Sequence, residues 1–318
     1  MPLFWIPIIT FALFVIISLA ISYIFSGVTL HSVRQPIITT PKDYGLEYED
    51  VAFESTDGLE LKGWFIPAGP AGGDGPDKVI ILTHPMTFNR HGFLVKNQGW
   101  LPLFKTDVDL LQIAPTLHRE GYSLLMFDFR NHGESESGIT GAGLNEYQGV
   151  LGAIEYVKSR PSLRDPQIGF FSFCMGANST IVALSKGGDL VKEIKFLVAI
   201  QPVSSYMFFP CYMRSLYTPL SLYLIPIVDR IVQWRGGYAF AEMSPLAYAK
   251  DVETPTLYVQ AREDRWTKPE DVQGFYDATP GPKELWWIEG PIRRFEAYNM
   301  VCQDPSRLIA FAQKWFAT

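Results

Sequence analysis

The chain has 318 residues, of which 47% are hydrophobic and 19% are charged, a composition that excludes disorder and suits one large α/β domain or two small ones. The formal net charge is −6, and the scattered lysines and arginines argue against nucleic-acid binding. Cys174, Cys211 and Cys302 form neither a disulfide framework nor a metal-ligand spacing. Because nucleotide and metal signatures are also lacking, no cofactor or metal is expected.

An uncharged apolar run opens the chain from Leu3 to Phe25. It is long enough for the roughly 20 residues that a spanning helix needs, so we expect contact with the lipid bilayer through residues 3–25. A secretory signal peptide, the alternative, would have a positive start, a shorter run and a clear cleavage site. The sequence therefore predicts a retained transmembrane anchor over residues 1–30. Arg34 and Lys42 follow it, which favours a cytoplasmic soluble domain.

Residues 31–45 predict a linker, and the globular domain is expected over residues 46–318. The apolar alternation of residues 51–55 and 59–65 predicts two antiparallel strands joined by a turn at Asp57-Gly58. Residues 78–83 follow as a buried strand that ends in the turn His84-Pro85-Met86.

Residues 107–119 predict a helix, and residues 122–127 predict the next strand. The sequence D-F-R-N-H-G-E-S comes directly after that strand, at positions 128–135. A further helix is predicted over residues 146–158, where apolar side chains at spacings of three and four would cover a sheet.

Residues 167–172 predict a short buried strand, which a tight turn joins to a helix that starts near Asn178. Cys174 stands at the centre of that turn, with Ser172 and Gly176 at the small flanking positions of a G-x-S-x-G nucleophile elbow. A thiol there faces the positive end of the helix dipole, which favours its thiolate. The Met175 N–H would be one oxyanion donor. The alternative is a small, buried, apolar cysteine.

Taken together, these motifs resemble the α/β-hydrolase superfamily over residues 46–318. The resemblance implies a mostly parallel twisted sheet with helices on both faces and an inserted cap at about residues 202–240. It implies that the loop at 128–135 is mostly structural, so that His132 is a hydrogen-bonded loop residue. It also places the second oxyanion N–H after the strand at 78–83, where Pro85 has none, so that Met86 or Thr87 is the candidate.

The predicted cap is rich in tyrosine, leucine and proline. Its segments 206–209 and 220–227 are apolar enough to contact acyl chains or the bilayer, or simply to pack on the core. The insertion at residues 92–104 is also apolar, and it would floor a pocket, touch the membrane or, as we favour, simply pack on the domain.

The resemblance places the triad acid at Asp264 and the general-base histidine in the loop at residues 289–295. That loop reads E-G-P-I-R-R-F, so that Ile292 or Arg293 replaces the imidazole, and all five histidines precede Cys174. A guanidinium stays protonated and cannot act as the base.

Three substitutes for the missing base remain open. His84 or His91 reaches in from the oxyanion loop, Asp264 or Glu263 acts as the base, or an amine or thiol acceptor replaces water.

Two functions follow from these features. The first is a membrane-anchored enzyme that cleaves or transfers the acyl group of an apolar ester, thioester or lactone through Cys174. Asp264 would support the reaction, and the main-chain amides of Met86 and Met175 would hold the oxyanion. The second is a catalytically inactive α/β-hydrolase that serves as a binding or structural subunit of a membrane protein complex, with an ion pair between Asp264 and Arg293.

Overall fold

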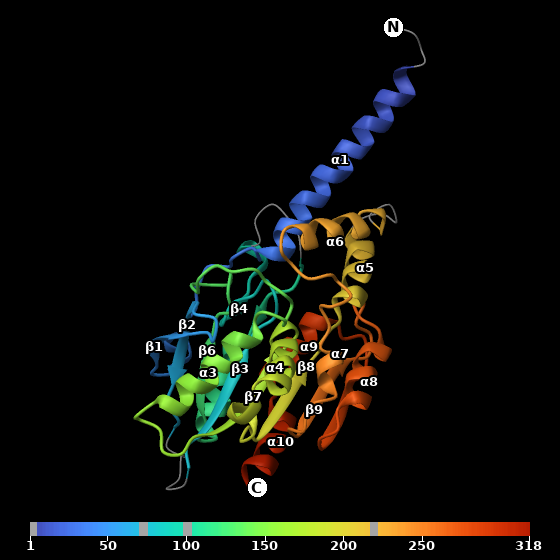
Figure 1. Ribbon diagram of the computed structural model, residues 1–318. Coiled ribbons are helices and arrows are strands. Elements are labelled where there is room, and N and C mark those ends of the chain that lie inside the picture. The colour runs from blue at the N-terminus through green and yellow to red at the C-terminus, as the bar shows by residue number, and fades with distance from the viewer. Residues whose placement is uncertain (1–4, 70–75, 98–103, 217–221) are drawn as a thin grey trace.

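The computed structural model describes residues 5–69, 76–97, 104–216 and 222–318 (Figure 1). Within these ranges the centre is an eight-stranded sheet in the order β1-β2-β6-β3-β7-β8-β9-β10. Only the β1–β2 and β2–β6 pairs of this sheet are antiparallel. Its strands are β1 (Glu49–Glu54), β2 (Glu60–Ile66), β3 (Lys78–Thr83), β6 (Ser123–Phe127), β7 (Gln167–Phe173), β8 (Phe196–Ile200), β9 (Thr256–Ala261) and β10 (Lys283–Ile288). Two short strands, β4 (Gly92–Phe93) and β5 (Val108–Asp109), pair separately.

Helices cover both faces of the sheet. The helices of the described residues are α1 (Trp5–Leu30), α2 (Ala114–Arg119), α3 (Tyr147–Ser159), α4 (Met175–Lys186), α5 (Ser205–Leu216), α6 (Ile225–Trp234), α7 (Leu246–Ala249), α8 (Pro269–Ala278), α9 (Arg294–Gln303) and α10 (Ser306–Phe316). Short 3₁₀ turns are η1 (Pro41–Tyr44), η2 (Val95–Asn97), η3 (Leu111–Ile113) and η4 (Gly188–Val191). The predicted fold class, a mostly parallel sheet between two helical layers, is confirmed.

The side chains of β3 show how one strand serves both layers. Successive side chains of a strand point to opposite faces of the sheet. Val79 and Ile81 accordingly belong to the core beneath α3, α4 and α8, whereas Ile80 and Leu82 belong to the core beneath α2, α9 and α10. All four are buried, so the continuous apolar run in this strand is that of a sheet covered on both sides.

The predicted antiparallel start is confirmed, because β1 and β2 pair and Gly58 takes a positive φ of 84° in the turn between them. The predicted helix over residues 107–119 is wrong in its first half. Val108 pairs with Phe93 in the short second sheet, and the Asp109 carboxylate accepts the Leu111 N–H at 2.9 Å. The α-helix begins only at Ala114, next to a proline suited to a first turn.

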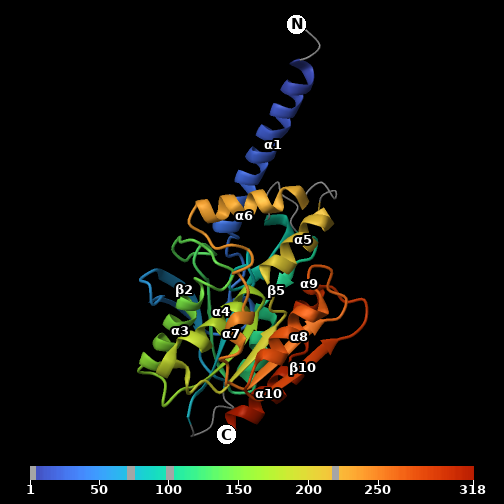
Figure 2. The same ribbon diagram turned by 45° about the vertical axis from the view of Figure 1, so that its right-hand side comes forward.

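One end of the sheet carries the elements that concern function. The carboxyl ends of the parallel strands lie there, and α5 and α6 lie above them between β8 and β9 in sequence (Figure 2). These two helices fall within residues 202–240, where the cap is predicted.

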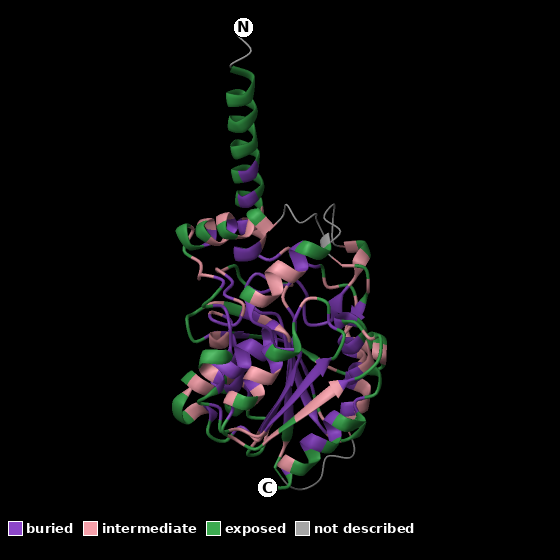
Figure 3. Ribbon diagram, turned by 90° about the vertical axis from the view of Figure 1, so that its right-hand side faces the viewer, coloured by how far each residue is buried: buried purple, intermediate pink, exposed green. Residues whose placement is uncertain are grey.

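Helix α1 projects from this same end of the domain (Figure 1). It is long and apolar enough to cross a membrane. Its first turns are exposed, whereas one side of its second half is buried, at Ser18, Ser22, Ser26, Thr29 and Leu30 (Figure 3). Arg235, which follows α6, donates from Nη1 to Ser26 Oγ at 2.9 Å, and the Thr140 N–H donates to the Leu30 carbonyl at 2.9 Å. The end of α1 is therefore part of the folded domain.

The segment after α1 is packed against the domain rather than free. The Arg34 guanidinium donates to the Gly133 carbonyl at 2.8 Å, and Asn89 Nδ2 donates to the carbonyl of the buried Gln35 at 3.0 Å. These contacts fix the position of α1 relative to the sheet. Residues 98–103 of the apolar insertion lie outside the described residues, but Phe104 is described and packs on Phe295 with a centroid separation of 4.6 Å.

Close packing of α3 on β1 leaves no room for a side chain at Gly152. A Cβ there would lie 2.2 Å from the Glu54 carbonyl oxygen, whereas a Cβ at Gly274 in α8 would meet only Leu246 at 3.7 Å. We expect Gly152→Ala to lower the free energy of unfolding by about 1–3 kcal/mol, the usual range for overpacking. The matched variant Gly274→Ala should be neutral or stabilising by up to about 1 kcal/mol, since alanine favours helix. Chemical unfolding followed by tryptophan fluorescence measures both, and equal losses would contradict this view of the interface.

Candidate active site

Cys174 lies on a strained turn between β7 and α4. Its φ of 50° and ψ of −111° are unusual for a residue with a side chain and carry a strain of roughly 1–3 kcal/mol. Two hydrogen bonds hold the turn, from the Cys174 N–H to the Ile200 carbonyl at 2.8 Å and from the Asn178 N–H to the Cys174 carbonyl at 2.9 Å. The thiol is half-buried, at the N-terminus of a twelve-residue helix, where the helix dipole favours an anion.

The small residues beside Cys174 are required by packing. A Cβ at Gly176 would lie 2.4 Å from Thr83 Oγ1, so any larger residue would push α4 away from β3. Ser172 is buried and its hydroxyl pairs with Thr180 Oγ1 at 2.9 Å, which ties the strand to the helix.

The loop after β3 faces the elbow. Thr87 has a φ of 68°, and its N–H donates to His132 Nε2 at 3.1 Å, so this amide is occupied. Among the described residues, the N–H groups of Met86 and Met175 have no hydrogen-bond partner, and both residues line the cavity that Cys174 borders. These two amides are the donors available to an oxyanion. Of the two candidates in the loop after β3, Met86 and Thr87, Met86 is therefore the one whose N–H is available.

His132 is a hydrogen-bonded loop histidine, as the resemblance implied. Its Nδ1 lies 2.7 Å from the Arg130 carbonyl, which fixes the proton on that nitrogen and leaves Nε2 to accept from Thr87. Burial and the neighbouring His84 lower its pKa to about 3. A neutral imidazole thus holds the oxyanion loop.

Neither histidine proposed as a substitute base serves the elbow. His84 is fully buried, with Nδ1 2.7 Å from the Pro85 carbonyl and Nε2 accepting the Phe129 N–H at 3.0 Å. Burial lowers its pKa to about 4. His91 Nε2 contacts the Pro36 carbonyl at 3.2 Å, and burial lowers the pKa of this ring too. The expectation that either reaches in is wrong, because their nitrogens brace the loop instead.

Asp264 is buried and pairs with Arg294, not with Arg293. The Arg294 Nη2 lies 2.6 Å from Asp264 Oδ2, and Arg294 Nε donates to the same oxygen at 2.9 Å. Arg293 is exposed, and its N–H donates to the Glu296 carboxylate at 2.8 Å, so it caps α9. We predicted that Arg293 occupies the position of the base, but the arginine that pairs with Asp264 is the next residue, Arg294. Helix α9 begins at Arg294, and the side chain of this residue is buried.

The charges of Asp264 and Arg294 are both stabilised by neighbouring groups of the protein. Burial opposes the charge on the carboxylate, but Arg294 and the hydroxyl of Thr267, 2.7 Å away, keep the pKa of Asp264 below its usual range. Arg294 Nη1 donates to the Gln201 carbonyl at 3.0 Å and to the Tyr298 hydroxyl at 3.1 Å. Because its oxygens are occupied and its charge is stabilised, Asp264 is a poor general base.

Sequence reasoning missed Arg294, Tyr298 and Gln201. Tyr298 is fully buried, and burial raises the pKa of its hydroxyl well above the usual value, so it stays protonated. The pKa of Arg294 is also raised: burial opposes its charge, and Asp264, Tyr298 and Cys174 more than offset this. The guanidinium is therefore a fixed cation at the cavity that Cys174 also lines. The two successive arginines after the last strand signalled that a guanidinium lies at this site. Which of the two faces inward depends on where α9 begins.

A cavity of about 130 Å³ opens over Cys174. Its walls come from α1, the loop after β3, α4, α5, α6 and α9, and they are mainly aromatic and aliphatic. Trp266, which follows Asp264, packs on Tyr212 of α5 and on Phe295, with centroid separations of 5.3 Å in both contacts. Residues of α5 thus line a pocket and also pack on neighbouring aromatic side chains. A cavity with such walls suits an apolar ligand.

The order of the sheet, the elbow at Cys174 and the helices on both faces define an α/β-hydrolase fold. No protein-family model matches the chain. Esterase Pf2001 of Pyrococcus furiosus has a TM-score of 0.65 and 28% identity, and the match covers 90% of this chain and 99% of that one. This likeness supports placing the chain in the α/β-hydrolase superfamily.

Two curated proteins are also similar. The uncharacterised protein YqkD of Bacillus subtilis is 28% identical over 246 residues, which cover 76% of this chain and 72% of that protein. Polyketide transferase grgF of Penicillium sp. is 25% identical over 162 residues, which cover 50% of this chain and 46% of that protein. An esterase and a transferase are thus among its relatives, which is consistent with the predicted leaning towards a hydrolase or an acyltransferase.

The two buried imidazoles predict a loss of stability in acid. The folded pKa values of His84 and His132, about 4 and about 3, lie below the unfolded value of about 6.5. Their contribution to the free energy of unfolding is therefore complete above about pH 6.5. It is lost as the pH falls towards the pKa values of the folded state. We expect the melting temperature to drop between pH 7 and pH 5, and to drop less steeply in His132→Gln. His31→Gln, which removes an exposed imidazole, is the matched control, and a slope that is the same in all three proteins would contradict the prediction.

Proposed function

We propose that the chain is a membrane-anchored acyl-transferring enzyme in which Cys174 carries the acyl group as a thioester. One observation carries the proposal: a thiol on a strained strand-to-helix turn lines an apolar cavity together with Met86 and Met175, whose main-chain amides have no hydrogen-bond partner in the part of the chain that the structure describes. The likeness to an esterase and to a polyketide transferase supports acyl chemistry.

The first step needs no imidazole. Cys174, whose thiol lies at the N-terminus of α4 and lines the same cavity as Arg294, loses its proton to water and attacks the carbonyl carbon of the substrate as a thiolate. The oxygen becomes an oxyanion that the N–H groups of Met86 and Met175 stabilise. Collapse of this intermediate breaks the bond to the leaving group and leaves the acyl group on sulfur.

The nature of the leaving group follows from the missing acid and base. An alkoxide must be protonated as it departs, whereas a thiolate leaves unprotonated because its conjugate acid is far stronger. Arg294 holds a permanent charge and Asp264 is tied to it. A thioester is therefore a better substrate than an alkyl ester.

The second step determines the type of enzyme. General base catalysis contributes about 10²–10⁴-fold, so water without a base attacks the acyl-enzyme slowly. An acceptor that arrives as a thiolate or as a free amine supplies its own nucleophile. We therefore favour an acyltransferase over a rapid hydrolase.

The anchor is supported by the packing at the end of α1. Ser22, Ser26 and Leu30 are buried against the domain, and Phe25 and Val28 line the cavity. Cleavage of this helix as a signal peptide would remove part of the site wall. A cytoplasmic location of the domain, based on Arg34 and Lys42, stays a prediction.

The second candidate is a catalytically inactive binding protein. It is favoured by the ion pair between Arg294 and Asp264 at the base position, whose hydrogen-bonding groups are already occupied. Such a protein would retain the cavity but not acylate Cys174.

Acylation of Cys174 separates the two candidates. We expect the full chain, incubated in detergent with the decanoyl thioester of N-acetylcysteamine, to gain one acyl mass that survives denaturation and is released by hydroxylamine. Cys174→Ala should gain none, whereas Cys211→Ala, which removes another half-buried thiol, should behave as the parent does. Intact-protein mass spectrometry makes the measurement. An unmodified parent, or label retained in Cys174→Ala, would exclude the proposed acyl-enzyme.

A histidine in place of Arg294 tests whether only the base is missing. Arg294→His places an imidazole next to Asp264, and we expect hydrolysis of the acyl-enzyme to rise towards the 10²–10⁴-fold that a general base supplies. Arg294→Gln removes the charge without adding a base and should show no such gain. The decay of the acylated mass with time gives both rates, and equal rates in the two variants would contradict this account of slow turnover.

A further inference from the structure

We propose that the end of α1 is a wall of the acyl-binding cavity and that the ligand is a single-chain acyl lipid drawn from the bilayer. The inference deepens the proposed function and rests on it for the position of the reacting carbonyl. It goes further in making the membrane anchor part of the binding site and in naming the source of the substrate.

The lining of the cavity carries the proposal. Phe25, Val28 and Thr29 of α1 border the same cavity as Cys174. The candidate membrane-spanning helix and the candidate nucleophile thus border one cavity, although they are far apart in the sequence. An acyl chain that left the bilayer beside α1 would meet the mainly apolar lining of this cavity before it reached the thiol.

The walls suit a hydrocarbon chain better than a polar ligand. Opposite α1 lie Phe209 of α5 and Phe240, stacked with a centroid separation of 4.3 Å, and Val228 of α6. Two polar side chains at the cavity are engaged: Asn178 Nδ2 donates to the Val203 carbonyl at 2.8 Å, and Arg294 is bound to Asp264. The Thr87 hydroxyl, which also lines the cavity, has no hydrogen-bond partner among the described residues. The rest of the lining is mainly apolar.

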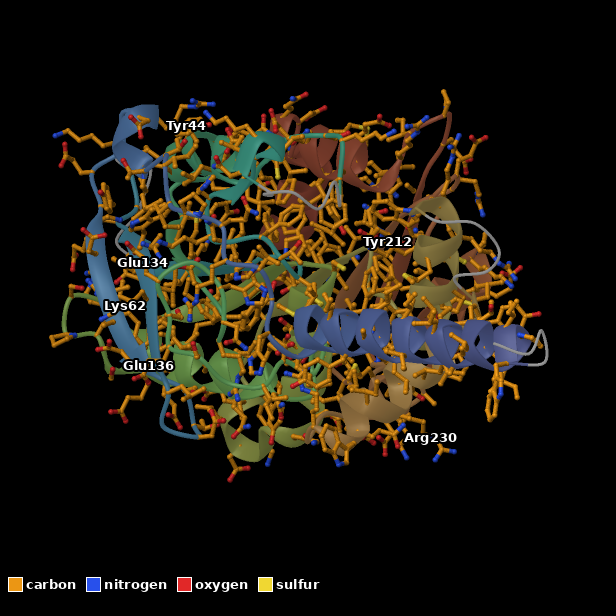
Figure 4. The ribbon with its side chains drawn as sticks, turned by 90° about the horizontal axis from the view of Figure 1, so that it is seen from above. Tyr44, Lys62, Glu134, Glu136, Tyr212 and Arg230 are labelled. Carbon is orange, nitrogen blue, oxygen red and sulfur yellow. The ribbon has the colours of Figure 1, made fainter. Side chains whose placement is uncertain are left out.

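The surface around the base of α1 fits the membrane interface. Helix α6 lies crosswise at the foot of α1 (Figure 2), and Trp234 at its end is 79% exposed. Arg230 points away from the domain at the outer edge of α6, whereas Tyr212 of α5 lies within it (Figure 4). Exposed tryptophan and arginine on a helix parallel to the surface are typical of the headgroup region.

Arg235 joins these elements. Its guanidinium stacks over the Tyr23 ring at 4.6 Å and donates to Ser26 Oγ at 2.9 Å. This contact fixes α6 to α1 just above the cavity. The cavity consequently lies directly beneath the plane in which a bilayer around α1 would end.

Photocrosslinking in a bilayer tests the inference. The full chain is reconstituted in phosphatidylcholine nanodiscs that contain a trace of a palmitic acid analogue with a diazirine on its chain. We expect crosslinks to peptides that line the cavity, such as the one around Met175, besides those to the exposed face of α1. Val28→Trp fills the cavity and should lower the labelling of cavity peptides by about tenfold.

Matched variants keep the test decisive. Ile17→Trp adds the same ring on the exposed part of α1 and should leave the labelling of cavity peptides unchanged. Val28→Phe replaces Val28→Trp if the latter melts at a lower temperature than the parent. Parent chains labelled only on the outer face of α1, or equal cavity labelling in Val28→Trp and Ile17→Trp, would overturn the inference.

The readout is independent of catalysis. Cys174→Ala should retain the cavity crosslinks, because they report binding alone. Cavity crosslinks without acylation of Cys174 would support the lipid site while refuting the proposed acyl transfer. Acylation by a soluble thioester without cavity crosslinks would support acyl transfer and refute the bilayer as the source of the ligand.

Discussion

The buried ion pair between Asp264 and Arg294 is the constraint on which the chemistry of this site depends. Removing two charges from water is costly, and the cost is offset here by direct contact and by hydrogen bonds to Thr267, Gln201 and Tyr298. The pair ties the loop after β9 to the first turn of α9. It also leaves a permanent cation at the cavity that the candidate nucleophile lines.

Backbone strain is concentrated around the same cavity. Thr87, Ala142 and Cys174 all have positive φ angles and all line it. Gln201, also at positive φ, lies against Arg294 through two hydrogen bonds. Such conformations persist only where the surrounding structure imposes them, and they gather at functional sites. The neutral His84 and His132 supply part of that support from beneath the oxyanion loop.

The position of α1 connects the anchor with the site. Its last turns are fixed by Arg235 and Thr140, and residues 31–45 are held by contacts such as that of Arg34 with Gly133. Helix α1 is thus oriented relative to the sheet rather than tethered by a flexible linker. Under the proposed function, the cavity at the elbow and the bilayer around α1 would share one apolar wall.

Local patterns in the sequence were sufficient for much of the fold. The elbow around Cys174, the hairpin at Gly58 and the strand at residues 78–83 each depend on neighbours in the sequence, so their residues predict them. The helix expected at residues 107–119 failed because Val108 pairs with Phe93, a contact that no local pattern reveals. The expected roles of His84 and His91 failed for a similar reason, since their partners come from distant loops.

The sequence by itself determined the class of fold, the thiol at the turn after β7 and the lack of a histidine after Cys174, and its resemblance to a family pointed to the carboxylate of Asp264. Tertiary structure alone decided which arginine pairs with Asp264, because the capping of α9 by Glu296 leaves Arg293 exposed and Arg294 buried. It alone brought Phe25 and Val28 of α1 to the cavity of Cys174. Hydrophobic patterning indicates that a segment is buried or in lipid, but only the packing of the whole chain selects the surface that it contacts.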